Sequence, residues 1–382
     1  LAYFWRAEWA SAFPRGLEAL TLLPAGSLWW CTAMSHLFVI AANINETGQL
    51  QEQLSLFTSV QPALDAHCQY ITAASVLVTM FSLLGSRHEA CRFLDSLQRA
   101  ARGHGELDDT TRGFLNQGHA WYTRILMPDP FLACTLAQQC VEAFQRTEDV
   151  RNLLNCQVLL GMAQKELGDL AASEATLTSS LELAERQGEP FMVATAKLYL
   201  ASLLSDQTAD APLLQAQQLA RAMLELNLGP NYTGFAHGVL SQILRHQGDL
   251  QAAEEHARKA VAMLVMMRPY QIVAFINLCR ALLAQGRVGE ARAAAEQGLQ
   301  IVTDLGGSGY NEVSLRLAVA EARYADSDLA AAHEALAFTL AELQRRAVQI
   351  VDPEQRARFL QQVPDNARAR ELARLWLGQK LS

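Results

Sequence analysis

A repeated helical pattern constrains this chain more than any other feature of its sequence. Several stretches share an apolar segment with helical periodicity, a Gly-Asp-Leu-like break and a second segment rich in alanine. The clearest breaks lie at Gly168, Gly248, Gly286 and Ser327. Weaker copies predict further breaks near Pro14, Gly48, Gly85, Pro128 and Ala211. Successive breaks are about 34 to 43 residues apart, a period typical of stacked helical pairs.

The residue types at each break explain why a helix should form on either side of it. Glycine adopts the left-handed conformation that ends a helix, and an aspartate directly after it can cap the next helix. Small residues are expected where paired helices approach closely, namely Gly161, Ala253, Ala291 and Ala332. Leucines are expected to fill the space between the layers, namely Leu177, Leu299 and Leu336. The prolines fall between the predicted helices, and no segment predicts a strand.

In these positions the chain resembles the tetratricopeptide repeat family. The match lies in the small residue of the first helix, the turn glycine and the alanines of the second helix, as in Gly161 with Gly168, or Gly248 with Ala253 and Ala260. The bulky aromatic residue early in the first helix is mostly missing, and the period exceeds the usual 34 residues. Longer repeats of this kind resemble the superhelical regions of large bacterial signalling ATPases, including maltose-regulator-type transcription activators.

The expected fold is therefore all-α, an α-α superhelix (a right-handed solenoid) of tetratricopeptide-like helical hairpins. Residues 1–350 should form about nine helix pairs, with turns at the breaks named above. Residues 351–382 depart from the repeat and are interpreted as a C-terminal capping segment. Within it, three apolar residues are expected to cover the exposed end of the last pair, namely Leu372, Leu375 and Trp376.

The capping segment also contains a second resemblance. Its string DPEQRARFLQQVPDNARARELARLWLG, residues 352–378, is similar to the extreme C-terminus of large bacterial proteins, notably of the myxobacterial type. Those proteins join a serine/threonine kinase domain, an AAA/STAND-type ATPase and a repeat tail. The resemblance implies that a kinase and an ATPase lie upstream, and that this chain, which opens on Leu1, is a fragment of such a regulator.

Composition excludes several classes of partner. The chain has 31 Lys and Arg against 39 Asp and Glu among its 382 residues, so 31 − 39 gives a net charge of −8, which argues against a nucleic-acid partner. The longest apolar runs, 31–44 and 71–84, span about 14 residues, too short to cross a bilayer, and no membrane partner is expected. The seven cysteines are scattered without a C-x-x-C pair, a pattern that favours free thiols in a cytoplasmic protein.

Motifs for catalysis or for cofactor and metal binding are absent. No phosphate loop, kinase core or zinc-ligand spacing occurs, so the sequence predicts no catalytic, cofactor-binding or metal-binding residue and no cofactor. The glycine cluster 306–309 lacks the following Lys-Ser/Thr and is interpreted as a flexible connector. An enzyme would require a deep, dry pocket that holds several ionisable groups.

The concave groove is the remaining candidate site. Alignment on the turns places polar residues of mixed character on or near its wall, namely Asn45, Thr79, Lys165, Gln242, Arg245, Arg280, Glu321 and Tyr324. Such a wall can recognise a peptide or a small polar ligand, although each residue could equally belong to a solvated helix face.

The leading hypothesis is a non-enzymatic scaffold that mediates protein–protein contact within a larger bacterial signalling protein of the kinase/ATPase type. Its partner would be a protein or peptide, including the parent's own upstream domains. The alternative is a sensing domain that binds a small polar inducer in the lumen and controls an upstream ATPase.

Overall fold

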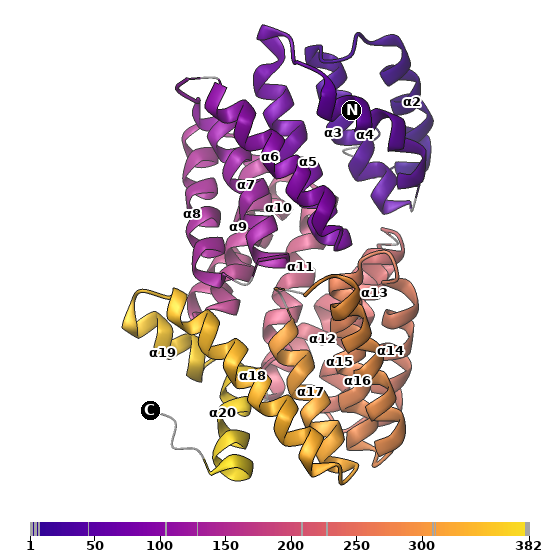
Figure 1. Ribbon diagram of the computed structural model, residues 1–382. Helices are drawn as coiled ribbons and strands as arrows, with labels where there is room; N and C mark the ends of the chain where they lie inside the picture. The colour runs from indigo at the N-terminus through magenta and orange to yellow at the C-terminus, as the bar shows by residue number, and fades with distance from the viewer. Residues whose placement is uncertain are drawn as a thin grey trace.

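The computed structural model describes residues 3, 6, 8–44, 46–103, 105–127, 129–207, 209–226, 228–307, 309 and 311–378, and these contain helices and no strand. In chain order the elements are α2 (Trp9–Leu22), α3 (Leu28–Asn43), η1 (Thr47–Leu50), α4 (Gln51–Ser59), η2 (Leu64–Ala66), α5 (His67–Leu84), α6 (Arg87–Gly103), α7 (Asp109–Ile125), α8 (Pro130–Arg146), α9 (Val150–Glu166), α10 (Leu170–Gln187), α11 (Pro190–Leu204), α12 (Asp210–Glu225), α13 (Pro230–His246), α14 (Leu250–Met263), α15 (Arg268–Ala284), α16 (Val288–Asp304), α17 (Glu312–Ala325), α18 (Leu329–Gln349), α19 (Pro353–Gln361) and α20 (Pro364–Leu377). They stack as hairpins into a superhelix (Figure 1), which confirms the predicted all-α fold class.

The four clearest predicted breaks, and the weaker one at Gly85, separate two helices through the expected chemistry. A glycine with φ between +75° and +83° ends the first helix at Gly85, Gly168, Gly248 and Gly286. Ser327 takes the same left-handed conformation, with φ +64°, between α17 and α18. Aspartates then cap the second helices by accepting a hydrogen bond from the backbone N–H three residues on, namely Asp169, Asp249 and Asp328.

The weaker breaks are less accurate. The prediction of a turn near Pro14 is wrong, because Pro14 lies inside α2. Proline removes one helical hydrogen bond there, but α2 still buries Phe13 and Leu20 and packs against α3. Gly48 lies within η1. Ala211 lies in the first turn of α12, and the turn expected near it lies between the end of α11 and the start of α12. Pro128 lies outside the described residues.

The small residues lie where the paired helices meet. Ala253, Ala291 and Ala332 are fully buried. A Cβ atom built on Gly161 would lie 2.6 Å from Cγ of Leu177, so glycine permits the close approach of α9 and α10.

The helix through residues 71–84 is longer than the apolar run suggested. Together η2 and α5 form a helical stretch, Leu64–Leu84, of 21 residues, which could span a membrane on length and composition alone. Half of its most apolar window is buried inside the fold, and α5 packs against α3, α6 and α7. Its place is that of a core helix.

Two cysteines depart from the expectation of free thiols. The structure joins Cys140 of α8 and Cys156 of α9 in a disulfide, and both side chains are fully buried. Neighbouring helices bring them together although the sequence shows no local cysteine pair.

Successive turns of the superhelix contact each other directly. Asn231 of α13 donates to the carbonyl of Ala42 in α3 (3.4 Å). Arg87 of α6 donates to the carbonyl of Gly307 (3.2 Å), and α5 packs against α15. At the C-terminal end, Arg358 of α19 forms an ion pair with Asp169 (3.2 Å), where α19 lies beneath α8 and α9 in Figure 1. The superhelix is therefore closed upon itself and encloses a lumen.

Candidate functional site in the lumen

The first helices of the hairpins form the inner wall of the superhelix. Helices α3, α5, α7, α9, α11, α13 and α15 all contribute side chains to one cavity of about 370 Å³, here named the N-terminal chamber. A second cavity of about 820 Å³, the C-terminal chamber, lies among α9, α11, α13, α15, α17 and α20. The walls of both chambers therefore come from helices far apart in the chain.

The N-terminal chamber has an aromatic wall with amide groups. Its rings are those of Phe114, Trp121, Phe191, Tyr199, Tyr232, Phe235 and Tyr270. Gln117 of α7 and Asn155 of α9 also line it, and neither side chain has a hydrogen-bond partner among the described residues. An amide side chain offers both a donor and an acceptor, as a peptide backbone does. The chamber can therefore hold apolar groups while pairing with a backbone.

A buried polar network separates the two chambers. Arg124 forms an ion pair with Glu166 (2.6 Å) and donates to the hydroxyl of Tyr270 (3.3 Å), which lies 3.4 Å from that of Tyr199. Burial raises the pKa of Tyr199 well above its ordinary value, although the charge of Arg124 opposes the shift, so this phenol stays neutral. Burial likewise raises the pKa of Glu166 against the pull of Arg124. Arg124 and Glu166 line the C-terminal chamber, Tyr270 lines the N-terminal one, and Tyr199 lines both.

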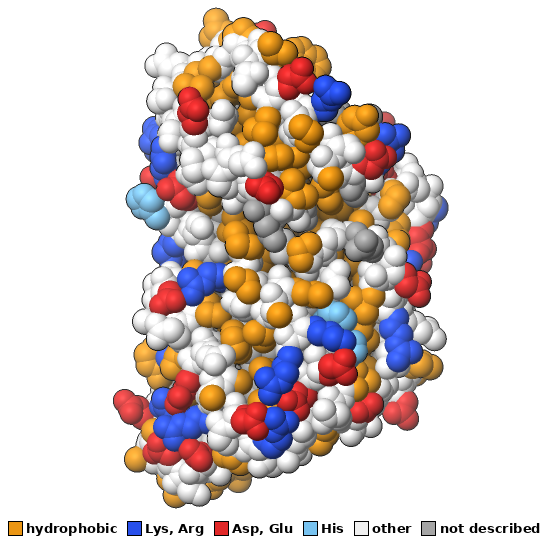
Figure 2. All heavy atoms as spheres, turned by 90° about the vertical axis from the view of Figure 1, so that its right-hand side faces the viewer, with side chains coloured by type: hydrophobic (Ala, Val, Ile, Leu, Met, Phe, Trp, Pro, Cys, Tyr) orange, Lys and Arg blue, Asp and Glu red, His pale blue; other side chains and the backbone are white. Residues whose placement is uncertain are grey.

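The C-terminal chamber contains most of the groove residues predicted from the sequence. Its lining includes Lys165, Gln242, Arg245, Arg280, Glu321 and Tyr324. Thr79 lines the N-terminal chamber instead, and Asn45 lies outside the described residues. On the side of the molecule shown in Figure 2, charged side chains of both signs are frequent in the lower half, and hydrophobic ones are visible across the middle.

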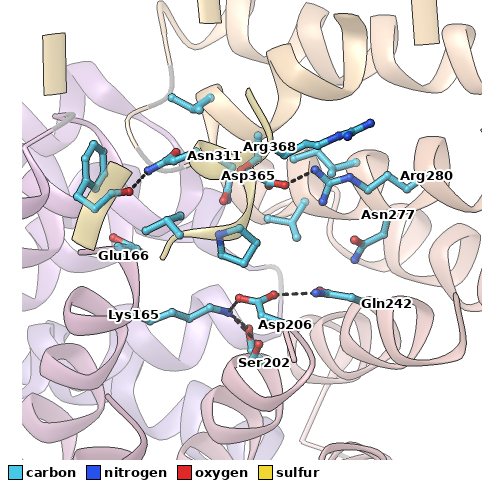
Figure 3. Close-up of a pocket in the computed structure, with 18 of the residues that line it drawn as sticks. Lys165, Glu166, Ser202, Asp206, Gln242, Asn277, Arg280, Asn311, Asp365 and Arg368 are labelled. Carbon is cyan, nitrogen blue, oxygen red and sulfur yellow. Dashed lines mark hydrogen bonds and ion pairs between the residues drawn. The ribbon is translucent and has the colours of Figure 1, made fainter. Parts of the chain in front are cut away.

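One part of the C-terminal chamber is a compact polar group. Lys165 forms an ion pair with Asp206 (3.0 Å) and donates to the carbonyl of Ser202 (2.8 Å). Gln242 donates to the same Asp206 carboxylate (2.7 Å). In Figure 3 these side chains converge from α9, α11 and α13 on one side of the pocket. Their charges are already balanced within the group.

The other part pairs the wall with α20. Arg280 forms an ion pair with Asp365 (2.6 Å), and Glu321 with Arg368 (3.0 Å). Tyr324 stacks on Trp376, with ring centroids 4.1 Å apart and planes 4° from parallel. Arg280, Glu321 and Tyr324 were predicted to lie on the wall, whereas the two charged partners from α20 were not predicted.

The C-terminal segment does more than cover the last hairpin. Leu372 is buried against α17 and α18, but Leu375 is exposed, so the prediction that Leu375 covers the end of the last pair is wrong. Trp376 faces the lumen because it stacks on Tyr324, a residue of the concave wall. Gln117 and Asn155 were also missed, although they follow Thr79 at intervals close to the repeat period.

No group of three or more His, Cys, Asp or Glu side chains that could hold a metal ion occurs within the described part of the chain.

Comparison with known proteins shows the fold. No family model and no curated protein matches the chain. Among solved structures, a Rap protein complexed with competence and sporulation factor is similar, with a TM-score of 0.63, 13% identity, and coverage of 92% of this chain and 99% of that one.

Two further solved structures have the same architecture. One is the Rap conjugation gene regulator of plasmid pLS20 in complex with the Phr* peptide (TM-score 0.53, 13% identity, coverage 92% and 98%). The other is the apo quorum sensor NprR from B. thuringiensis (TM-score 0.50, 14% identity, coverage 82% and 87%). The chain thus has a tetratricopeptide-like helical-repeat fold.

Proposed function

We propose that this chain is a non-enzymatic regulatory module that binds an extended peptide, free or as a segment of a protein, in the lumen of its superhelix. The observation that supports this most directly is the pair of amide side chains, Gln117 and Asn155, on the aromatic wall of the N-terminal chamber. One similar structure is a complex with competence and sporulation factor and another is a complex with the Phr* peptide, which supports a peptide as the ligand class.

A peptide fits this chamber better than a compact metabolite does. The wall extends over seven helices and contains both aromatic rings and amide side chains that can pair with a backbone. Several ionisable groups of the C-terminal chamber pair with one another, as Lys165 does with Asp206, rather than forming a nucleophile with an adjacent base. This arrangement favours binding over catalysis.

A small polar ligand is the second candidate. The C-terminal chamber, with about 820 Å³ and side chains of both charges, is large enough to hold one. In that case the chain would be an inducer-sensing domain that controls an upstream ATPase.

The resemblance of residues 352–378 to bacterial kinase–ATPase regulators supports a place for the module within a larger cytoplasmic signalling protein. In that setting the peptide could also come from the parent's own upstream domains.

The test is selection from a random peptide library displayed on phage, followed by fluorescence anisotropy with the selected peptides. Each hydrogen bond to a ligand contributes about 0.5–1.5 kcal/mol, so Gln117→Ala and Asn155→Ala should each weaken binding about two- to tenfold. Gln139→Ala, on the exposed face of α8, is the matched control and should leave the affinity unchanged.

A thermal-shift screen separates the two candidates. A ligand at 100 times its dissociation constant stabilises the folded chain by about 2.7 kcal/mol. The peptide proposal fails if no library peptide is retained, or if the Gln117 and Asn155 variants bind selected peptides as tightly as the unaltered chain. Stabilisation by metabolites alone would favour the inducer-sensing candidate.

A further inference from the structure

Helix α20 enters the lumen as an internal occupant. After α18 the chain folds back through α19, and α20 contributes Asp365, Arg368 and Trp376 to the lining of the C-terminal chamber. In Figure 3 the Asp365 carboxylate points from α20 toward Arg280 of α15. A carboxylate of the chain itself therefore already lies on the wall of this chamber.

The Asp365 carboxylate is held in its charged form. It forms an ion pair with Arg280 at 2.6 Å, and both side chains are mostly buried. Burial acts to raise the pKa of Asp365, but Arg280, a hydrogen bond from Ser314 and the nearby charge of Arg245 hold the pKa below its ordinary value. The wall is thus built to stabilise a negative oxygen at this point.

A second guanidinium lies beside this pair without an acid of its own. Arg245 of α13 lines the same chamber, and no carboxylate lies within ion-pair distance of it among the described residues. A terminal nitrogen of its guanidinium lies 2.6 Å from His246 Nε2, and its buried Nε has no hydrogen-bond partner among the described residues. Burial and the charge of Arg280 lower the pKa of Arg245, while the more distant carboxylates of Asp365, Glu321 and Asp206 oppose the shift. A half-buried guanidinium without an ion pair of its own favours an added anion.

Helix α20 is held by both apolar and polar contacts. Its buried apolar residues are Ala369, Leu372 and Ala373, and the partly buried Trp376 and Leu377 pack against the same cluster of α17 and α18. The two ion pairs with Arg280 and Glu321 provide the polar part of the contact between α20 and the wall. A competing carboxylate would remove one of these contacts directly.

We propose that Arg245 and Arg280 form a carboxylate-binding site in the C-terminal chamber, that Asp365 occupies it in the closed chain, and that an acidic residue of a bound peptide replaces Asp365 when α20 withdraws. This inference rests on the proposed function and adds to it a ligand chemistry and a competing internal segment. It makes the acidic residue of the peptide the group that opens the C-terminal chamber.

The binding test uses the full chain and a fluorescein-labelled synthetic peptide of residues 363–372, VPDNARAREL, amidated at its C-terminus. Asp365→Asn in the chain removes the internal carboxylate, so this variant should bind the peptide at least tenfold more tightly than the unaltered chain does. A peptide with Asn in place of its Asp should bind the variant at least tenfold more weakly. Adding Arg245→Gln to the variant should also weaken binding at least tenfold, although Arg245 has no ion pair with α20 to lose.

Matched measurements identify the source of any effect. Arg374→Gln, on the exposed side of α20, should change nothing. Hydrogen–deuterium exchange of the α20 amides should be at least tenfold faster in the Asp365→Asn chain than in the unaltered or Arg374→Gln chains. Circular dichroism melting establishes that each variant is folded.

Three results would overturn the inference. The Asp365→Asn chain could bind the Asp and Asn peptides with equal affinity, or it could fail to bind the peptide. The third is that adding Arg245→Gln to this chain leaves its affinity for the peptide unchanged. Displacement of the peptide by free succinate at an equal concentration would show that the site takes small carboxylates rather than a peptide. Library peptides that need Gln117 and Asn155 but ignore Arg245 and Arg280 would leave the proposed function standing and refute only this inference.

Discussion

At the scale of single residues, turn glycines with the same backbone conformation have different surroundings. Gly168 and Gly248 end the first helices of their hairpins with φ of +79° and +83°. A Cβ atom on Gly168 would lie 2.6 Å from the carbonyl oxygen of Arg358 in α19, whereas a Cβ atom on Gly248 would meet nothing within 4 Å. The absence of a side chain at Gly168 therefore permits both the left-handed turn and the close packing of α19 on it.

Replacing these two glycines should separate the two roles. Gly248→Ala places a side chain in the left-handed region and should lower the free energy of unfolding by about 1 kcal/mol. Gly168→Ala adds an overlap with the α19 backbone, which costs about a further 1–3 kcal/mol. Urea unfolding followed by circular dichroism measures both values. Equal losses would mean that α19 does not pack on this turn.

At the scale of elements, a histidine pair joins the two helices of one hairpin. His237 of α13 and His256 of α14 have their Nδ1 atoms 2.9 Å apart. Burial, together with the charges of His256 and Lys259, lowers the pKa of His237 to about 4. Burial, Lys259 and Arg221 also lower the pKa of His256, while Glu255 opposes the shift of both rings. The folded hairpin therefore favours neutral imidazoles.

This pair predicts a loss of stability in acid. The unfolded chain binds protons on these rings near pH 6.5, but the folded chain resists protonation of His237 until about pH 4. The free energy of unfolding should therefore fall as the pH drops from about 6.5 toward about 4. The difference in urea midpoint between pH 7 and pH 5 should be smaller for His237→Gln than for the unaltered chain. His88→Gln, on the exposed side of α6, is the control, and an equal pH dependence in all three would contradict the prediction.

At the scale of the whole molecule, the superhelix is held by its hairpin interfaces and by contacts between successive turns. One apolar core extends from Trp9 to Ala274 without a break between separate domains. The contacts between turns join residues far apart in sequence, as Arg87 does with Gly307 and Arg358 with Asp169. These contacts hold successive turns of the superhelix together.

Removal of the turn-to-turn contacts should loosen the molecule without melting its helices. The double variant Arg87→Ala and Arg358→Ala should lower the free energy of unfolding by about 1–3 kcal/mol, since each hydrogen bond contributes about 0.5–1.5 kcal/mol. Small-angle X-ray scattering should show a larger maximum dimension, with the helical circular dichroism signal unchanged. Arg102→Ala, whose contact stays within α6, is the control. An unchanged scattering profile would mean that the hairpin interfaces alone hold the closed shape.

The candidate site was predictable where the repeat period applies. Lys165, Gln242 and Arg280 were placed on the wall because residues at corresponding positions of successive hairpins share one face. Their partners from α20 follow no period: Asp365 lies 85 positions from Arg280, and Arg368 lies 47 positions from Glu321. Pro14 shows the converse failure, because a residue typical of turns lies inside a helix that tertiary packing stabilises.

Local patterns were sufficient to predict the helices, most of their turns and the inner face of each hairpin, because helical hydrogen bonds and caps depend on residues only a few positions apart. The closed superhelix, the two chambers, the disulfide and the entry of α20 into the lumen are properties of the folded molecule alone. Small rotations between neighbouring hairpins accumulate along the chain, so every interface together determines which turns meet. For that reason the polar wall could be predicted from the repeat, whereas its internal occupant required the tertiary structure.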